Sequence, residues 1–366
     1  MIDYKNKRYS VKHIISLIIV CFIIILWNGS INISEHPNID AHAYKNMSEG
    51  NISFTDPPFC YRILGPVIVS CLPFSSNFGF RLLSVILIIL VAISFYLFLI
   101  KLNNSSSTAF FTTILLLSNK YLIGFLTWNY FQVPDLLGFL SIILLFITMQ
   151  GEQWIFFSFI FFFGILSRET AILIIPSLLI YVYYQKPPHK QKIKILISII
   201  PGLIIALIIR MYINPTLQIG LFDQLSNHAT KWLIPEVWLR TFISAWLPIS
   251  LLPIIFFHTT KEFINKYHYI VYLIPAVLFS ASFGGDNERL LLPAAIVIYS
   301  IIANIMETHN TKIMFFSLII ASLISTPHHM MGILNVPNRM FSLGFAVAGT
   351  VVATISGLWI KKFKTL

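Results

Sequence analysis

Residues Leu82–Ile100 read LLSVILIILVAISFYLFLI, a run of nineteen residues without a charged side chain. As an α-helix this run would be about 29 Å long, which matches the hydrocarbon core of a bilayer. Residues Ile14–Trp27 form a second uncharged run. Because the apolar residues occur in long runs and do not alternate along short strands, the sequence excludes a transmembrane β-barrel. Helices then remain as the way to satisfy the backbone hydrogen bonds in lipid.

The composition of the whole chain indicates an integral membrane protein. Of its 366 residues, 57% are hydrophobic and only 11% are charged, whereas a soluble domain carries about 25% charged residues. A soluble core could not bury so many Ile, Leu and Phe side chains. The three cysteines show no paired spacing, so the sequence predicts neither a disulfide framework nor a cysteine metal site.

We predict an all-α, polytopic membrane protein with about twelve spans, some of them short or broken. A span needs about 20 apolar residues. All spans belong to a single transmembrane domain, 1–366, and no soluble domain is expected. The predicted spans are 12–28, 80–100, 107–126, 134–150, 154–167, 171–185, 194–212, 237–257, 268–284, 290–306, 312–327 and 341–360.

The basic residues predict the orientation of these spans. If the N-terminus is cytoplasmic, the inner segments carry fifteen of the 25 basic residues and only four of the 14 acidic ones. The positive-inside rule therefore places both termini in the cytoplasm. The net charge of +11 then lies on the inner side, where membrane lipids are a sufficient partner and no nucleic acid is needed. We expect a multi-pass protein of the cell inner (cytoplasmic) membrane.

The outer basic residues differ in kind from the inner ones. Seven of the ten are arginines, and most lie beside or inside apolar segments, where a charge costs roughly 2.5–3.5 kcal/mol near a span centre. Arginine binds phosphate and carboxylate in a bidentate way. The set of outer arginines therefore suggests an anionic lipid headgroup, either a phosphate or a pyrophosphate. The alternative is that each arginine pairs with an outer acid or extends to the interface.

The largest outer segment, 29–79, is expected to contain short interfacial helices. In one such helix Asp40 and Tyr44 would share a face, at positions i and i+4. A partly desolvated carboxylate at this place can act as a general base. The alternative for Asp40 is an ordinary solvated loop acid.

The stretch Asp56–Pro66 follows in the same outer segment. Pro57 and Pro58 stop any preceding helix. The mostly apolar residues after Arg62 are too few to span and predict a helix that lies on the outer leaflet. Arg62 would then lie at the level of the lipid phosphates. The alternative is a loop packed on the helical bundle.

Three further charged positions interrupt apolar sequence. Arg168 and Glu169 separate two apolar stretches and form either a turn or a buried ion pair that lines a cavity. Asp135 follows Val133-Pro134, where an acid also favours the dipole of a helix N-terminus. Arg289 precedes a predicted span.

Four of these motifs together resemble the GT-C superfamily of polytopic membrane glycosyltransferases. They are scattered over the chain between residues 40 and 293. They are Asp-X-X-X-Tyr at Asp40–Tyr44, Pro-Phe-X-Tyr-Arg-Ile-Leu-X-Pro at Pro58–Pro66, Arg-Glu-Thr at Arg168–Thr170 and Arg-X-X-X-Pro at Arg289–Pro293.

The resemblance implies a glycosyltransferase with a polyprenyl-phosphate or polyprenyl-pyrophosphate sugar donor, and a glycan or lipid acceptor at the outer face. An acid of the first outer loop is the catalytic base in this superfamily or binds a divalent metal such as Mg or Mn, and Asp40 holds that position here. Asp56 lacks the usual pairing with a second acid, so a metal remains an open expectation. The expected substrate-binding residues are Tyr44, Asp56, Tyr61, Arg62, Asp135, Arg168, Glu169 and Arg289.

The expected reaction is an inverting transfer, with Asp40 as the base and the arginines on the leaving phosphate. Two other functions remain open. An O-antigen-type polysaccharide polymerase would also use outer arginines and a lipid-linked substrate. A transporter or flippase for lipid-linked glycans would instead show charges or broken helices at mid-membrane.

Overall fold

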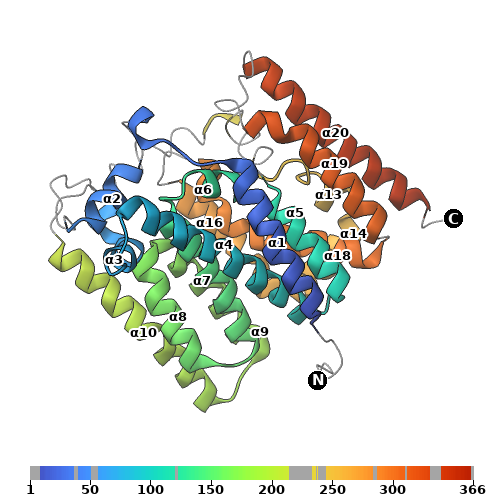
Figure 1. The fold of residues 1–366 in the computed structure, drawn as a ribbon. Helices are drawn as coiled ribbons and strands as arrows, with labels where there is room; N and C mark the ends of the chain where they lie inside the picture. Colours follow the sequence, from blue (N-terminus) through green and yellow to red (C-terminus); the bar gives the residue numbers. More distant parts are fainter. Residues whose placement is uncertain are drawn as a thin grey trace.

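The computed structural model describes residues 9–36, 40–50, 57–119, 123–213, 233–235, 237, 245–282, 287–309, 311–329 and 339–363. Within these ranges the regular secondary structure is entirely helical (Figure 1). The prediction of an all-α protein is therefore confirmed for this part of the chain.

Five of the described helices are long and apolar enough to cross a membrane. They are α1 (Val11–Asn28), α4 (Ser76–Lys101), α7 (Val133–Gln150), α10 (His189–Tyr212) and α20 (Arg339–Phe363). Shorter helices complete the bundle. They are α5 (Ser106–Leu117), α6 (Phe125–Trp128), α8 (Trp154–Ser167), α9 (Ile174–Gln185), α13 (Leu252–Ile255), α14 (Phe257–Lys266), α15 (His268–Val271), α16 (Leu273–Ala281), α18 (Ala295–Thr308) and α19 (Thr311–His329).

Ten of the twelve predicted ranges coincide with an apolar helical segment, to within a few residues at most ends. In the eleventh, 107–126, the helix α5 ends at Leu117. The twelfth, 237–257, falls partly outside the described residues, and its later part contains only the short helix α13 and the first residue of α14. The sequence pattern succeeds because a helix in lipid needs a nearly continuous apolar surface, which is visible without knowledge of any partner.

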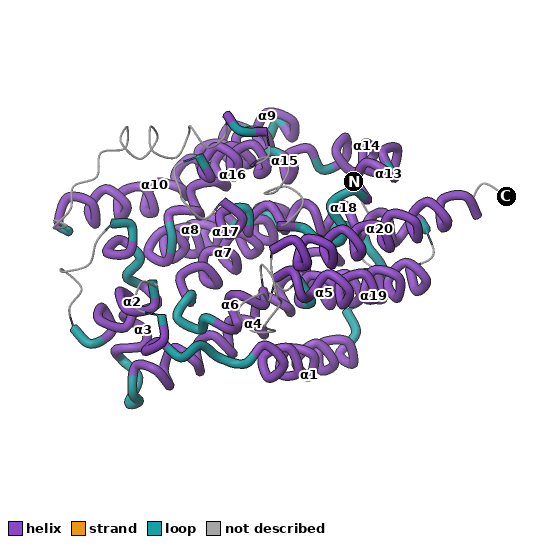
Figure 2. The backbone as a smooth tube through the Cα atoms, turned by 90° about the horizontal axis from the view of Figure 1, so that it is seen from above, coloured by secondary structure: helices purple, strands orange, loops and turns teal. Residues whose placement is uncertain are grey.

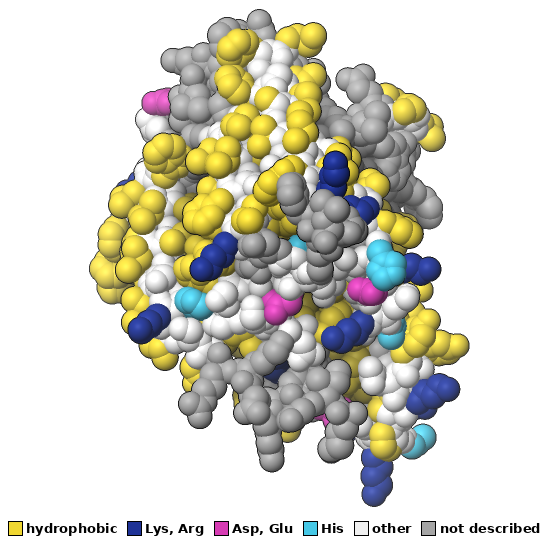
Figure 3. Space-filling model, turned by 90° about the vertical axis from the view of Figure 1, so that its right-hand side faces the viewer, with side chains coloured by type: hydrophobic (Ala, Val, Ile, Leu, Met, Phe, Trp, Pro, Cys, Tyr) yellow, Lys and Arg dark blue, Asp and Glu magenta, His cyan; other side chains and the backbone are white. Residues whose placement is uncertain are grey.

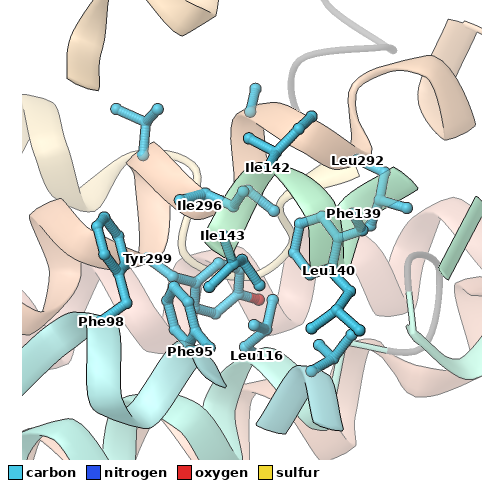
Figure 4. Packing of buried hydrophobic residues seen from close by; sticks show 14 of the residues in the cluster. Phe95, Phe98, Leu116, Phe139, Leu140, Ile142, Ile143, Leu292, Ile296 and Tyr299 are labelled. Atoms are coloured by element: carbon cyan, nitrogen blue, oxygen red, sulfur yellow. The ribbon is translucent and has the colours of Figure 1, made fainter. Parts of the chain in front are cut away.

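Helix α7 lies inside the bundle and packs against both α4 and α8. Figure 4 shows its Phe139 and Ile143 among Phe95 and Phe98 of α4 and Tyr299 of α18. Since lipid tails are as apolar as these side chains, close van der Waals packing holds the helices together in a membrane.

The outer surface of the bundle is apolar as well. Leu26 of α1, Leu207 of α10 and Ile355 of α20 are 81%, 63% and 61% exposed. On the face drawn in Figure 3, apolar side chains cover the upper part, and lysine and arginine side chains lie mainly below them. So large an apolar surface would cause aggregation in water, so the described helices indicate a protein embedded in a membrane.

Two short helices form in the first predicted outer loop, as the sequence suggested. They are α2 (Ala41–Ser48) and α3 (Leu64–Ser70). Both lie at one end of the bundle, whereas α1 begins and α20 ends toward the opposite end (Figures 1 and 2).

A glycine allows the turn after α8 to approach α7 closely. A Cβ atom at Gly138 would lie 3.0 Å from Thr170 Oγ1 and 3.2 Å from Arg168 Cβ. Gly138 is one helical turn after Asp135, so the missing side chain leaves room for Arg168 beside that carboxylate. No sequence motif indicated this role.

Candidate functional site

Charged side chains from five separate segments meet at the end of the bundle that carries α2 and α3. We call this group the ion cluster. It consists of Asp40, Arg62, Asp135, Arg168, Glu169 and Arg289. Seven of the nine predicted site residues lie here, since Tyr44 also contacts the cluster.

The deepest part of the ion cluster is the pair of Asp135 and Arg168. Asp135 lies in the first turn of α7, which begins at Val133. The fixed φ angle of Pro134 suits this first turn. Arg168 directly follows α8 in an extended conformation, and its Nη1 donates to Asp135 Oδ1. The two side chains are 4% and 0% exposed. Of the two readings left open for Arg168, the structure shows a buried ion pair, although Arg168 pairs with Asp135 and not with Glu169.

Arg289 joins the buried pair to the first outer loop. It lies in the short helix α17 (Asn287–Leu290). Its Nη1 donates to Asp40 Oδ2 at 2.8 Å, and its Nε lies 3.5 Å from Asp135 Oδ2. One guanidinium therefore bridges two carboxylates that are 95 residues apart in the sequence.

Asp40 directly precedes α2 and is not a solvated loop acid. Besides Arg289, Gln132 Nε2 donates to Asp40 Oδ2 at 3.2 Å. Burial alone would raise the pKa of this carboxyl, but Arg289, Gln132 and nearby Arg62 outweigh burial and hold the pKa below its ordinary value. Asp40 is therefore ionised at neutral pH.

Arg62 connects the two short helices of the outer loop to the turn after α8. It follows the 3-10 helix η3 (Phe59–Tyr61) and is 7% exposed. Its Nε donates to Glu169 Oε2 at 3.3 Å, and its Nη1 donates to the hydroxyl of Tyr44 at 3.1 Å. Burial works against its charge, but Tyr44 and Glu169 raise the pKa above the ordinary arginine value, so Arg62 stays protonated.

Of the other two predicted residues, Tyr61 is not part of the cluster. The ring of Tyr61 lies against the Arg210 guanidinium, 5.2 Å from its centre to Cζ. Asp56 lies outside the described residues.

The ion cluster is neutral overall and is partly exposed. Its three arginines balance three carboxylates, provided that all six groups are charged. Asp135 and Arg168 form its buried floor, whereas the side chains of Asp40, Arg289 and Glu169 are 19%, 17% and 28% exposed. A ligand would therefore meet Asp40, Arg289 and Glu169 first.

The described carboxylates do not suit a divalent metal. Each of the three faces at least one guanidinium group, which repels a dication. In the described part of the chain, no group of three His, Cys, Asp or Glu side chains is placed to hold a metal ion. We therefore derive no chemical step that uses one.

Sequence reasoning missed two buried amides beside the cluster. Gln132 is fully buried and bonds Asp40, while its Oε1 has no hydrogen-bond partner among the described residues. Asn129 is also fully buried, and both of its amide atoms have no partner there. Polar residues three and six positions before Asp135, in an otherwise apolar stretch, were the signal that could have identified them.

No family model, no curated protein sequence and no solved structure matches this chain. Any assignment of function therefore depends on the geometry of the ion cluster and on the motifs of the sequence.

The buried pair gives a testable prediction about stability. Asp135→Asn and Arg168→Gln should each lower the free energy of unfolding by about 3–5 kcal/mol, because each removes one partner of a buried ion pair. The double variant should lose clearly less than the sum of the two losses. Thermal or denaturant unfolding in detergent micelles measures all three.

The exposed pair Lys45–Glu49 of α2 provides the control. Glu49→Gln should change stability by less than about 1 kcal/mol. Additive losses in the double variant would show that Asp135 and Arg168 are not coupled as described.

Proposed function

We propose that the ion cluster is the donor site of a membrane glycosyltransferase. The enzyme would move a sugar from a polyprenyl-phosphate or polyprenyl-pyrophosphate carrier to a cell-envelope glycan or a lipid acceptor. The observation that supports this most is the meeting of three arginines beside Asp40, at one end of an apolar bundle. Arginines bind the phosphate, and the apolar bundle accommodates the lipid tail.

In the proposed topology, the chain crosses the cytoplasmic membrane about twelve times and both termini lie in the cytoplasm. Helices α2 and α3 then lie at the outer membrane interface, and the ion cluster opens to the outer face. The motif resemblance to the GT-C superfamily supports the same assignment.

Arg289 has the central part in the proposed mechanism. A carboxylate with a lowered pKa is a weak base, so Asp40 is not yet suited to take a proton. A phosphate that approaches the exposed side of the cluster would compete with Asp40 for Arg289, whose side chain is 17% exposed. When Arg289 turns to the phosphate, Asp40 loses its strongest partner and its pKa rises.

The chemical step then follows from these positions. The acceptor hydroxyl attacks the anomeric carbon and forms the new C–O bond, while its proton passes to Asp40. The bond from the anomeric carbon to the phosphate oxygen breaks, and its electron pair stays on the phosphate. Attack from the face opposite the leaving group inverts the anomeric centre.

The ion cluster also balances the charge that develops. As the phosphate leaves, it gains one negative charge, and as Asp40 takes the proton, the cluster gains one positive charge. Arg62, Arg168 and Arg289 thus stabilise the leaving group in a site of low polarity, where such stabilisation is strongest.

The first prediction of this proposal concerns cellular glycans. In a deletion strain, Asp40→Asn should fail to restore a glycan that the wild-type chain restores, with transfer lowered by about 10²- to 10⁴-fold. Glu49→Gln changes another acid of the same outer loop, outside the ion cluster, and should restore it fully. Mass spectrometry of surface and lipid-linked glycans makes the comparison.

The kind of defect separates the competing functions. A glycan that lacks one sugar in each unit supports a single-sugar transferase. Single repeat units without long chains would instead indicate a polymerase. A lipid-linked glycan of unchanged structure that accumulates on the inner leaflet would indicate a transporter. Normal glycans in the strain with Asp40→Asn would contradict the proposal.

A second prediction concerns pH. Because the pKa of Asp40 is lowered in the free protein, the acid limb of kcat/KM should lie below about pH 4. In the substrate complex Arg289 is on the phosphate, so the acid limb of kcat should lie at higher pH. Asp40 is needed as the anion, so activity falls as pH decreases through either limb.

Arg289→Gln is the matched variant for this prediction. Without the guanidinium, the pKa of Asp40 rises in the free protein, so the two limbs should move together. If the acid limbs of kcat and kcat/KM already coincide in the wild-type protein, Arg289 does not move from Asp40 to the phosphate as proposed.

A further inference from the structure

A groove runs along α8, and its charged mouth lies at the end of α8 that is away from the ion cluster. Helices α8 and α10 enclose this groove of about 800 Å³, within the size range of ligand sites. On α8 it is lined at Ile155, Phe159, Phe162 and Phe163, a spacing that follows one helix face. The groove lies on the lipid-facing surface, because Ile155 and Phe159 are 74% and 60% exposed.

The groove is closed where the two helices converge. Gly202 of α10 has no room for a Cβ atom against the ring of Phe161 of α8. From Pro201 and Ile197 of α10 the groove extends toward Lys194, just over two turns before this contact. Its length along each helix is about 10–12 Å at 1.5 Å per residue. That length corresponds to somewhat less than one leaflet of the hydrocarbon core.

The mouth of the groove carries two opposite charges. Glu152 precedes α8 and Lys194 lies in the second turn of α10, and both line the groove and are exposed. Neither makes an ion pair with the other, and neither has an ion-pair partner in the described ranges. Gln153 adds an amide at the same place. A ligand with one positive and one negative group next to an apolar tail fits this arrangement.

We infer that the groove binds a phospholipid with a primary ammonium headgroup, that is, a phosphatidylethanolamine. Lys194 pairs with its phosphate, Glu152 accepts hydrogen bonds from its ammonium group, and one acyl chain lies against Phe159 and Ile197. The charges at the mouth favour this headgroup over that of an anionic lipid such as phosphatidylglycerol. Such a lipid has no positive group to pair with the Glu152 carboxylate.

This site does not depend on the proposed glycosyl transfer. Trp154 and Arg168 are separated by about 21 Å along α8. A lipid phosphate at Lys194 is therefore too far from the ion cluster to serve as its donor phosphate. The groove would hold one phospholipid, from the leaflet that lies beside Lys194, as a permanently bound lipid.

The test uses the full chain, purified and stripped of lipid in mild detergent. Phosphatidylethanolamine, phosphatidylcholine and phosphatidylglycerol of identical chain length are each titrated, and bound lipid is counted by native mass spectrometry. Phosphatidylethanolamine should bind about tenfold more tightly than phosphatidylglycerol, a preference expected from one charge-assisted contact. Glu152→Gln should remove that preference, and Lys194→Gln should weaken both lipids.

A filled groove provides the second variant. Ile197→Trp should displace the acyl chain and lower binding at least about tenfold. Ile204→Trp is its control, because Ile204 is on the same helix with 50% exposure and does not line the groove. Equal binding of phosphatidylethanolamine and phosphatidylglycerol by the wild-type protein would overturn the inference. Equal binding of phosphatidylethanolamine by the two tryptophan variants would overturn it as well.

Discussion

The mutual neutralisation of three arginines and three carboxylates is the constraint on which the rest of the described structure depends. A buried charge in an apolar bundle is stable only beside an opposite charge. The floor of the cluster, Asp135 with Arg168, therefore fixes the start of α7 against the end of α8, and Gly138 makes that approach sterically possible. Arg62 and Arg289 then hold the first outer loop and α17 to the same place. Charge pairing thus positions segments that apolar packing alone would leave free to slide.

In the proposed function, the same pairing prepares the site for an anionic ligand. Arg289 is the most exposed of the three arginines, and its contact with Asp135 is long. It is therefore suited to leave Asp40 for a phosphate while the buried floor stays intact. Stability and function make opposite demands on Asp40, because the bonds that hold it in the resting protein also keep its basicity low.

Much of the fold was predictable from the sequence, and all six members of the ion cluster were among the expected site residues. Apolar runs identify helices in lipid without reference to any neighbour, and the good helix formers Ala41 and Ala43 indicated the short helix α2 in the first outer loop. Partners were not predictable. Asp40 and Arg289 are 249 residues apart, and no local pattern indicates that one guanidinium serves both Asp40 and Asp135. Tyr61 was expected in the site because it shares the Pro58–Pro66 motif with Arg62, yet its ring faces Arg210. The roles of Gln132 and Gly138 depend on contacts between helices, which a single sequence does not encode visibly.

Photo-crosslinking measures the central claim most directly, which is that the ion cluster receives a lipid-linked phosphate. The purified chain, reconstituted in liposomes, is irradiated with a polyprenyl phosphate that carries a diazirine near its phosphate, and the labelled peptides are identified by mass spectrometry. The account predicts labels on peptides that contain Asp40, Arg62 and Arg289, and competition by unlabelled polyprenyl phosphate. Labels confined to other parts of the bundle, or labelling that unlabelled carrier does not compete away, would contradict it.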